Sequence, residues 1–300
     1  YQTDLSDSLS VQDSPISSYI NSPSTYKGIS TMTTQTPHLV SINKLTGTRV
    51  LVIGGTSGLG FAVARAALEH GASVLVASSR PEKVQSAVSR LRTLYPDEQF
   101  TTRIAGTTVD LGDESTLESN ILTLLDKATQ PDLFPTNLSP NNADTPGKSE
   151  KVLLDHIVFT AGDALQIRPP TDPALDPAYI RALTTVRLLG GLMLAKHVPT
   201  YMVQSARSSL TLTSGAVAMR PPPGYSVGAM LGNAINGLGR GLAVDLAPVR
   251  VNVVAPGAVR TEMFDGLPEE VIERLKGRTL TGELGRPEDV VFAKGWKIPI

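Results

Sequence analysis

The chain has 300 residues, of which 27 are Lys or Arg and 28 are Asp or Glu, so its formal net charge is −1. This balance argues against a nucleic-acid-binding protein, which usually carries a basic stripe. Cysteine is absent, which excludes disulfides, thiol catalysis and cysteine metal sites, and the four histidines lack metal-ligand spacing.

The predicted elements alternate between strand and helix along most of the chain. Residues 1–41 are polar and rich in Ser, Thr and Pro, and we expect a disordered tail because such a segment buries little apolar surface. Short apolar runs predict buried strands within 49–55, 73–78, 100–113, 152–162, 208–215 and 249–257. Apolar residues at helical spacing predict helices within 59–71, 81–95, 115–128, 177–205 and 228–247.

Strand–helix alternation of this kind predicts an α/β fold with a doubly wound parallel sheet, Rossmann-like, with helices on both faces. We expect six to seven strands in a single domain over residues 42–300. The polar segment 129–151, rich in Pro, Asn and Asp, is predicted to be a flexible insertion in that domain. The chain stops soon after GRPEDV (286–291), so we expect an abbreviated C-terminal end.

A glycine-rich turn, IGGTSGLG (53–60), lies between the first predicted strand and the first predicted helix. Its glycines let the backbone turn sharply and approach a phosphate, and the helix start offers free N–H groups. The alternative is a turn whose glycines serve only close packing. The strand–loop–helix context favours a nucleotide site formed by Gly54, Thr56, Ser57, Gly58, Leu59 and Gly60.

The spacing of these glycines resembles the TGxxxGxG motif of the short-chain dehydrogenase/reductase family, with Ile53 in place of the threonine. Further motifs follow in the family's order: Asp-Leu after the third strand, FTAG for NNAG, and PGAVRT for PGxxxT. The resemblance covers residues 47–290 and implies a Rossmann-like fold with a nicotinamide cofactor. The cofactor contacts that it implies are Asp110, Leu111, Ala161, Gly162, Pro256, Gly257, Val259 and Thr261.

The end of the second predicted strand indicates which dinucleotide binds. An NAD enzyme usually places an acidic residue there, to bind the ribose hydroxyls. This chain has Ser78, Ser79 and Arg80 instead. Because an arginine pairs with a 2′-phosphate, we expect NADP(H), with Ser79 and Arg80 as contacts. The alternative role of Arg80 is that of a solvated loop residue.

The family's catalytic tyrosine and lysine do not both have counterparts in GYSVGAMLG (224–232). In the family, the tyrosine is the acid, the lysine lowers its pKa, and a serine and an asparagine assist. Matching GY to the tyrosine gives Tyr225, with Ala229 at the lysine. Counting back without gaps from GLAVDLAPVRVN gives Gly228 and Gly232, which we prefer because no gap falls within a helix. The lysine is missing under either placement.

Three side chains remain as catalytic candidates. Arg187 takes the place of the family's asparagine; it could stabilise developing negative charge, bind an acidic substrate group, or form a structural ion pair with Asp163. Ser214 stands where the family's serine ends the fifth strand, and could hold a substrate heteroatom or cap that strand. Tyr225 could donate a proton if the PPPG loop (221–224) folds inward, or form an aromatic wall.

These features predict an NADP(H)-dependent oxidoreductase that transfers hydride between nicotinamide and a small organic molecule with a C=O, C=N or activated C=C group. FTAGD, followed by PPPGYSV, is similar to a subgroup of fungal reductases of secondary metabolism that often lack the Tyr–Lys pair. The alternative is a catalytically silent NADP(H)-binding protein that acts as a sensor or partner subunit.

The expected partner is a small-molecule substrate, and we expect no nucleic acid, membrane or metal. No uninterrupted apolar run approaches the roughly 18 residues that span a bilayer. No secretory signal is evident, so we expect a cytoplasmic protein. The family resemblance implies a homodimer or homotetramer formed through the helices that follow the fourth and fifth strands.

Overall fold

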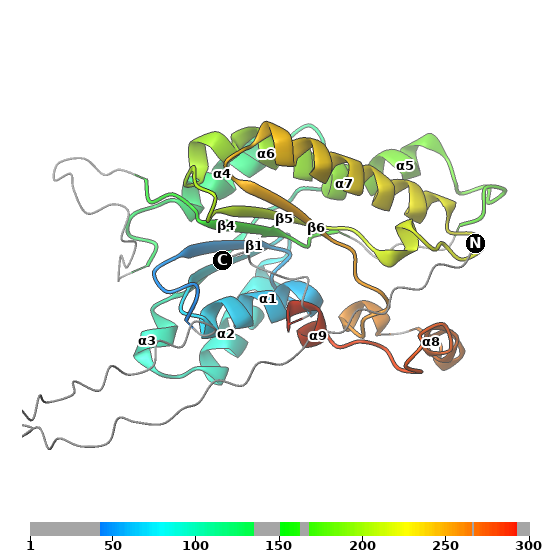
Figure 1. Ribbon diagram of the computed structural model, residues 1–300, viewed down its shortest axis with the longest axis horizontal. Coiled ribbons are helices and arrows are strands. Elements are labelled where there is room, and N and C mark those ends of the chain that lie inside the picture. The colour runs from blue at the N-terminus through cyan, green and yellow to red at the C-terminus, as the bar shows by residue number, and fades with distance from the viewer. Residues whose placement is uncertain (1–42, 135–150, 163–167, 266, 293–300) are drawn as a thin grey trace, which may run out of the picture. The chain divides into compact units, whose positions relative to one another are not determined.

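A computed structural model describes residues 43–134, 151–162, 168–265 and 267–292 (Figure 1). These residues belong to one compact unit, Val40–Ile300. The tail predicted at 1–41 lies outside the described residues and stays a prediction. Of the insertion predicted at 129–151, Thr129 and Phe134 are buried, residues 135–150 lie outside the described part, and the flexible insertion stays a prediction.

The centre of the fold is a six-stranded parallel sheet with the strand order β3-β2-β1-β4-β5-β6. The order reverses between β1 and β4, whose neighbouring carboxyl ends form the switch point at which such sheets bind ligands. The predicted doubly wound sheet is therefore confirmed, with one strand inside each predicted segment. The strands are β1 (Arg49–Ile53), β2 (Ser73–Ser78), β3 (Ile104–Thr108), β4 (His156–Phe159), β5 (Ser209–Thr213) and β6 (Arg250–Val254).

Helices cover both faces of the sheet (Figure 1). One face carries α1 (Gly58–Glu69), α2 (Pro81–Leu94) and α9 (Pro287–Phe292). The other carries α4 (Leu117–Ala128), α6 (Gly190–Tyr201) and α7 (Ser226–Asp245). The remaining elements are α3 (Glu98–Thr101), α5 (Pro177–Thr184), the π-helical turn η2 (Thr185–Leu189), the 3-10 turns η3 (Ala216–Ala218) and η4 (Glu262–Phe264), and α8 (Glu269–Lys276).

β1 is buried on both faces, as its continuous apolar sequence predicts. Val50 and Val52 belong to the apolar cluster that includes α1, whereas Leu51 and Ile53 belong to the cluster that includes α4 and α6. Full burial of such a side chain contributes about 1.5–3 kcal/mol. The sheet thus anchors both helix layers and fixes the strand ends at which the site lies.

The helix predicted within 177–205 runs from Pro177 to Tyr201 but changes its winding midway. Asp176 caps its start by accepting a backbone N–H at 2.7 Å. η2, which contains Arg187, is a π-helical turn, a feature frequent at functional sites. By length and composition alone this helix could cross a membrane, a test that core helices of soluble proteins also pass. Its α6 part packs into the core of the sheet through Leu194, Ala195 and Val198.

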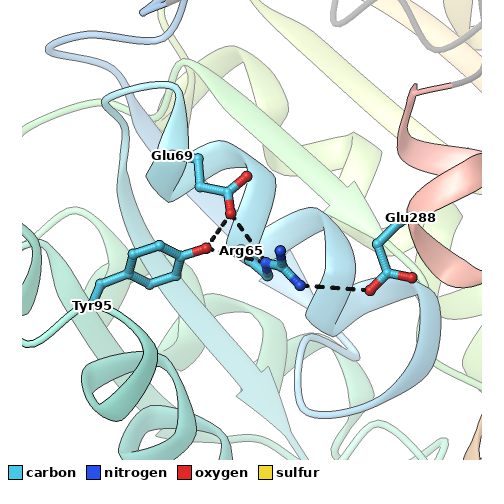
Figure 2. A network of polar contacts seen from close by, with 4 residues as sticks. All are labelled: Arg65, Glu69, Tyr95 and Glu288. Carbon is cyan, nitrogen blue, oxygen red and sulfur yellow. Dashed lines mark hydrogen bonds and ion pairs between the residues drawn. The ribbon is translucent and has the colours of Figure 1, made fainter.

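A polar network joins α9 to α1 (Figure 2). Arg65 of α1 lies 3.0 Å from Glu69 and 3.7 Å from Glu288 of α9. Tyr95, which follows α2, donates its hydroxyl to Glu69. These groups are partly exposed, so each pair contributes at most about 1 kcal/mol. Burial of Val291 in the same apolar cluster as α1 adds to this contact.

Candidate active site

The phosphate loop after β1 is shaped by close approaches between backbone segments. Gly54 has φ +85°, a conformation that favours glycine. A Cβ at Gly54 would lie 2.6 Å from the nitrogen of Ala161, and one at Gly60 would lie 2.1 Å from the Gly54 oxygen. The loop therefore packs directly on FTAG. Its glycines allow this packing, and the helix start that follows them offers backbone N–H groups of the kind that bind phosphates.

The start of α1 already holds an anionic group. The N–H of Gly58 donates to Oε2 of Glu262 at 2.7 Å. Oε1 of the same carboxylate lies 3.9 Å from Nη1 of Arg90, whose guanidinium lies 4.0 Å from the ring centroid of Phe61. A carboxylate at a helix start is the electrostatic arrangement that a phosphate also uses. The sequence analysis did not identify Glu262 or Arg90.

The PGAVRT segment (256–261) meets the phosphate loop, although the two lie far apart in the sequence. Val259 is buried and forms a bridge with Gly285, which holds the segment in place. A Cβ at Gly58 would lie 3.0 Å from Cγ2 of Thr261, so the two predicted motifs are in contact. Glu262 directly follows this motif, which was the available signal for the missed residue.

The residues predicted for the adenosine end lie at the carboxyl ends of β2 and β3, which are neighbours. Arg80 precedes α2 as its N-cap residue, and both Ser79 and Arg80 are exposed. None of the ion pairs found among the described residues involves Arg80. Asp110 is exposed and accepts the N–H of Gly112 at 2.9 Å, whereas Leu111 is buried.

Arg187 lies against the end of β4. Gly162 has φ +148°, and a Cβ there would lie 2.3 Å from Nε of Arg187. Only glycine therefore leaves room for the arginine side chain at this point. The structure thus brings Arg187 next to a glycine of FTAG, the segment that the family resemblance assigns to the cofactor. Asp163, the suggested ion-pair partner, lies outside the described residues.

Ser214 follows β5, and its hydroxyl donates to the carbonyl oxygen of Gly232 at 3.0 Å. A Cβ at Gly232 would lie 2.7 Å from Cβ of Ala218 and 3.2 Å from Oγ of Ser214. The hydroxyl proton therefore joins the end of β5 to α7, which is the structural alternative considered for this serine. Its oxygen can still accept a hydrogen bond from a substrate.

Tyr225 is the residue before α7 and is half-buried. Its carbonyl oxygen accepts the N–H of Ala229 at 2.9 Å, so the first helical turn fixes its backbone. Burial raises the pKa of the Tyr225 hydroxyl, while the positive charge of Arg187 lowers it and Tyr179 raises it. The hydroxyl is therefore neutral at physiological pH, and it lies within electrostatic reach of Arg187.

Arg187 thus lies against Gly162 beyond β4, Ser214 follows β5 and bonds α7, and Tyr225 precedes α7; their catalytic roles stay a prediction. The sequence has no lysine between Lys196 and Lys276, which covers both placements of the family's lysine. In the described part of the chain, no cluster of His, Asp or Glu side chains could hold a metal ion. The described candidate side chains therefore offer hydroxyl groups and one guanidinium.

Known proteins resemble the chain over most of its length. A family model described as an SDR-like Rossmann domain matches residues 41–132 and 142–296. The chain is 39% identical over 252 residues to the short-chain dehydrogenase/reductase ucsE of Acremonium sp, which covers 83% of this chain and 88% of that protein. It is 39% identical over 254 residues to the short-chain dehydrogenase/reductase malC of Malbranchea aurantiaca, with 83% and 87% covered.

The solved structure of MalC Reductase/Diels-Alderase from Malbranchea aurantiaca matches the fold with a TM-score of 0.68 and 38% sequence identity. That match covers 82% of this chain and 87% of the other. Together with the matching motifs and their positions on the sheet, these similarities show that the chain belongs to the short-chain dehydrogenase/reductase family of oxidoreductases, whose Rossmann fold binds a nicotinamide cofactor.

Proposed function

We propose that this protein is an NADP(H)-dependent oxidoreductase. The observation that carries the preference for NADP(H) is the exposed Arg80 at the end of β2. At this place an acidic residue binds ribose hydroxyls, whereas a guanidinium pairs with a 2′-phosphate. The neighbouring hydroxyl of Ser79 is also exposed and can donate to the same phosphate.

The residues of the site fit this cofactor along its length. The N–H of Gly58, which holds a carboxylate, supports a diphosphate at the start of α1. Arg80 would hold the 2′-phosphate, and Asp110 would contact the adenine. Gly162 and Thr261 lie in FTAG and PGAVRT, the two segments that the family resemblance assigns to cofactor contact. The bound cofactor supplies or accepts a hydride.

The proposed substrate is a small organic molecule with a C=O, C=N or activated C=C group. General acid catalysis typically contributes about 10²–10⁴-fold, and correct positioning contributes about 7–11 kcal/mol of barrier. An iminium ion needs the positioning but no proton at the reacting carbon, so it suits a site without the lysine. The fungal relatives, one of them described as a reductase, support a role in secondary metabolism.

Fluorescence titration of NADPH and NADH against the wild type, Arg80→Ala and Arg92→Ala tests the cofactor proposal. We expect tighter binding of NADPH than NADH. Loss of Arg80 should weaken the binding of NADPH by roughly 10–100-fold, which corresponds to one hydrogen bond to a charged group, and should leave the affinity for NADH unchanged. Arg92 is an exposed cation at the other end of α2, so its loss should change neither. Equal wild-type affinities would contradict the preference for NADP(H).

A catalytically silent NADP(H)-binding protein is the second candidate. It is favoured by the hydroxyl of Ser214, which donates to Gly232, and by Ala218, which fills the space of the lysine. Both candidates bind NADPH, but only a reductase consumes it when an electrophile is added. Constant NADPH absorbance with ketone, iminium and enone panels would favour the silent protein.

We also propose that the protein forms a homodimer or homotetramer through α6 and α7. Large apolar side chains are exposed on these helices: Leu192 is 40%, Met230 46% and Val244 77% exposed. Exposed apolar side chains on the helices that the family resemblance assigns to subunit contact support this proposal. Light scattering should therefore give a mass of at least twice the 31.8 kDa of one chain, and a monomer would contradict this proposal.

A further inference from the structure

In the gap-free placement, a side chain at the position of the family's catalytic tyrosine would collide with the ring of Tyr225, the residue before α7. The gap-free placement assigns that position to Gly228, which is buried in the first turn of α7. A Cβ at Gly228 would lie 2.5 Å from Cδ1 and 2.5 Å from Cε1 of Tyr225. The ring therefore occupies the volume in which a side chain from position 228 would begin. Tyr225, one of the two placements, thus packs its ring against the backbone of Gly228, the other placement.

At the position of the family's lysine, Ala218 and Ser214 take the space that a side chain would need. The gap-free placement assigns it to Gly232, and any side chain there would meet Ala218 at 2.7 Å. Ser214 closes the same space from the end of β5, at 3.2 Å. A lysine therefore does not fit, and a positive charge beside the tyrosine must come from another element.

Arg187 supplies that charge from η2, which contacts α7 within the same helix layer of the sheet. Its side chain lies over Gly162, whose lack of a Cβ makes room for the guanidinium. Its charge acts on the hydroxyl of Tyr225. The π-helical winding of η2 is an independent sign of function, because such turns occur frequently at functional sites.

We propose that Tyr225 donates the proton during carbonyl reduction and that Arg187 positions and polarises its hydroxyl, so that a relocated Tyr–Arg pair replaces the family's Tyr–Lys pair. This inference rests on the proposed reductase function. In the step, the carbonyl carbon gains a hydride from the reduced nicotinamide as the C=O π bond breaks. The carbonyl oxygen takes the proton of the Tyr225 O–H bond, and water returns a proton to the phenolate.

Burial of Tyr225 makes the two directions of the proposed reaction depend differently on pH. Burial is the larger influence on the pKa of Tyr225 and raises it, whereas Arg187 lowers it and Tyr179 raises it. Among the described residues, these are the charged and titratable groups that act on the hydroxyl. A neutral phenol can give a proton to an alkoxide, but only a phenolate can take one from an alcohol. Alcohol oxidation should therefore need a higher pH than ketone reduction.

Two substrates, one that needs a proton on reduction and one that does not, test whether Tyr225 donates that proton. Trifluoroacetophenone needs a proton on its carbonyl oxygen, whereas protonated methylpyrroline, an iminium ion, does not. In Tyr225→Phe, which keeps the ring on Gly228, kcat for the ketone should fall by about 100-fold. KM for the ketone and kcat for the iminium ion should be unchanged. Tyr201→Phe, which removes a hydroxyl bound to Asp126 on α4, should change neither.

Equal losses with both probes, or no loss with the ketone, would overturn the proposal. NADPH binding without reduction of either probe would also overturn it, while the proposed cofactor site would stand. Absence of NADPH binding by the folded protein would instead refute the proposed function itself. The two failures are therefore distinguishable.

Alkaline titration of phenolate ultraviolet absorbance tests Arg187 without any turnover. Subtracting the curve of the matching Tyr225→Phe variant isolates Tyr225 from the other tyrosines. In Arg187→Met the Tyr225 transition should move to higher pH, and in Arg187→Lys it should stay near that of the wild type. The ketone kcat should fall in the methionine variant and recover in the lysine variant. An unmoved transition in Arg187→Met would overturn the positioning role of this residue.

Discussion

Replacing Glu262 by glutamine should weaken the fold and tighten dinucleotide binding. The carboxylate accepts the N–H of Gly58 at 2.7 Å, and it lies 3.9 Å from Arg90. An anion in the first turn of a helix contributes about 0.3–1 kcal/mol. The ion pair, whose side chains are 50% and 48% exposed, adds at most about 1 kcal/mol. Glutamine keeps an acceptor oxygen but loses the charge, so the free energy of unfolding should fall by about 0.5–1.5 kcal/mol.

The same change should act in the opposite direction on binding. A diphosphate at the start of α1 competes with the Glu262 carboxylate for the helix N–H groups and for positive potential. Without the carboxylate charge, displacement costs less, and Kd for NADPH should fall by about 2–10-fold. A stability loss combined with an affinity gain is the signature of this competition.

Urea denaturation and NADPH fluorescence titration measure the two effects on one preparation. Glu269→Gln is the matched control, because Glu269 is also a glutamate in the first turn of a helix, α8. It should lower stability slightly and leave Kd unchanged. If Glu262→Gln destabilises the protein while NADPH binds equally or more weakly, the carboxylate and the diphosphate do not share the helix start, and the reasoning is refuted.

Three further changes test the packing and the electrostatics of the fold. Gly60→Ala places a methyl group 2.1 Å from the Gly54 oxygen, so denaturation should show a loss of about 1–3 kcal/mol and titration a loss of NADPH binding. Gly232→Lys meets Ala218 at 2.7 Å, so denaturation should show a loss of stability and steady-state kinetics no gain in ketone reduction. Burial lowers the pKa of His156 from 6.5 to about 4, so the unfolded state takes up a proton that the folded state resists. The associated stability is therefore fully present above pH 6.5 and falls by about 3 kcal/mol as the pH drops toward 4, a dependence that His156→Gln should remove in denaturation at several pH values.

The sheet could be predicted because each strand carries its signal locally. The sequence of β1 is RVLVI, in which an arginine is followed by four apolar residues, as expected of a strand that is buried on both faces. The glycine loop that follows it predicted the turn into α1. The long helix within 177–205 was predicted as one element, but apolar spacing does not distinguish a π-helical turn such as η2 from regular helix.

The site was harder to predict because its decisive contacts join distant residues. Glu262 reaches Gly58 across 204 positions, and neither residue alone indicates the hydrogen bond. Tyr225 and Gly228 are only three positions apart, and two different alignments place the family's catalytic tyrosine at one or the other. Only the path of the backbone into α7 shows that the ring of Tyr225 lies against Gly228.

Transfer of label from deuterated NADPH tests the central claim of a working NADP(H)-dependent reductase most directly. The protein would be incubated with NADPH deuterated at the reactive carbon and with ketone, iminium and enone electrophiles, and the products analysed by mass spectrometry. A reductase predicts one deuterium on the former electrophilic carbon of at least one product, lost in Arg80→Ala at low NADPH concentration. Tight NADPH binding without deuterium in any product would contradict the claim and identify a silent binding protein.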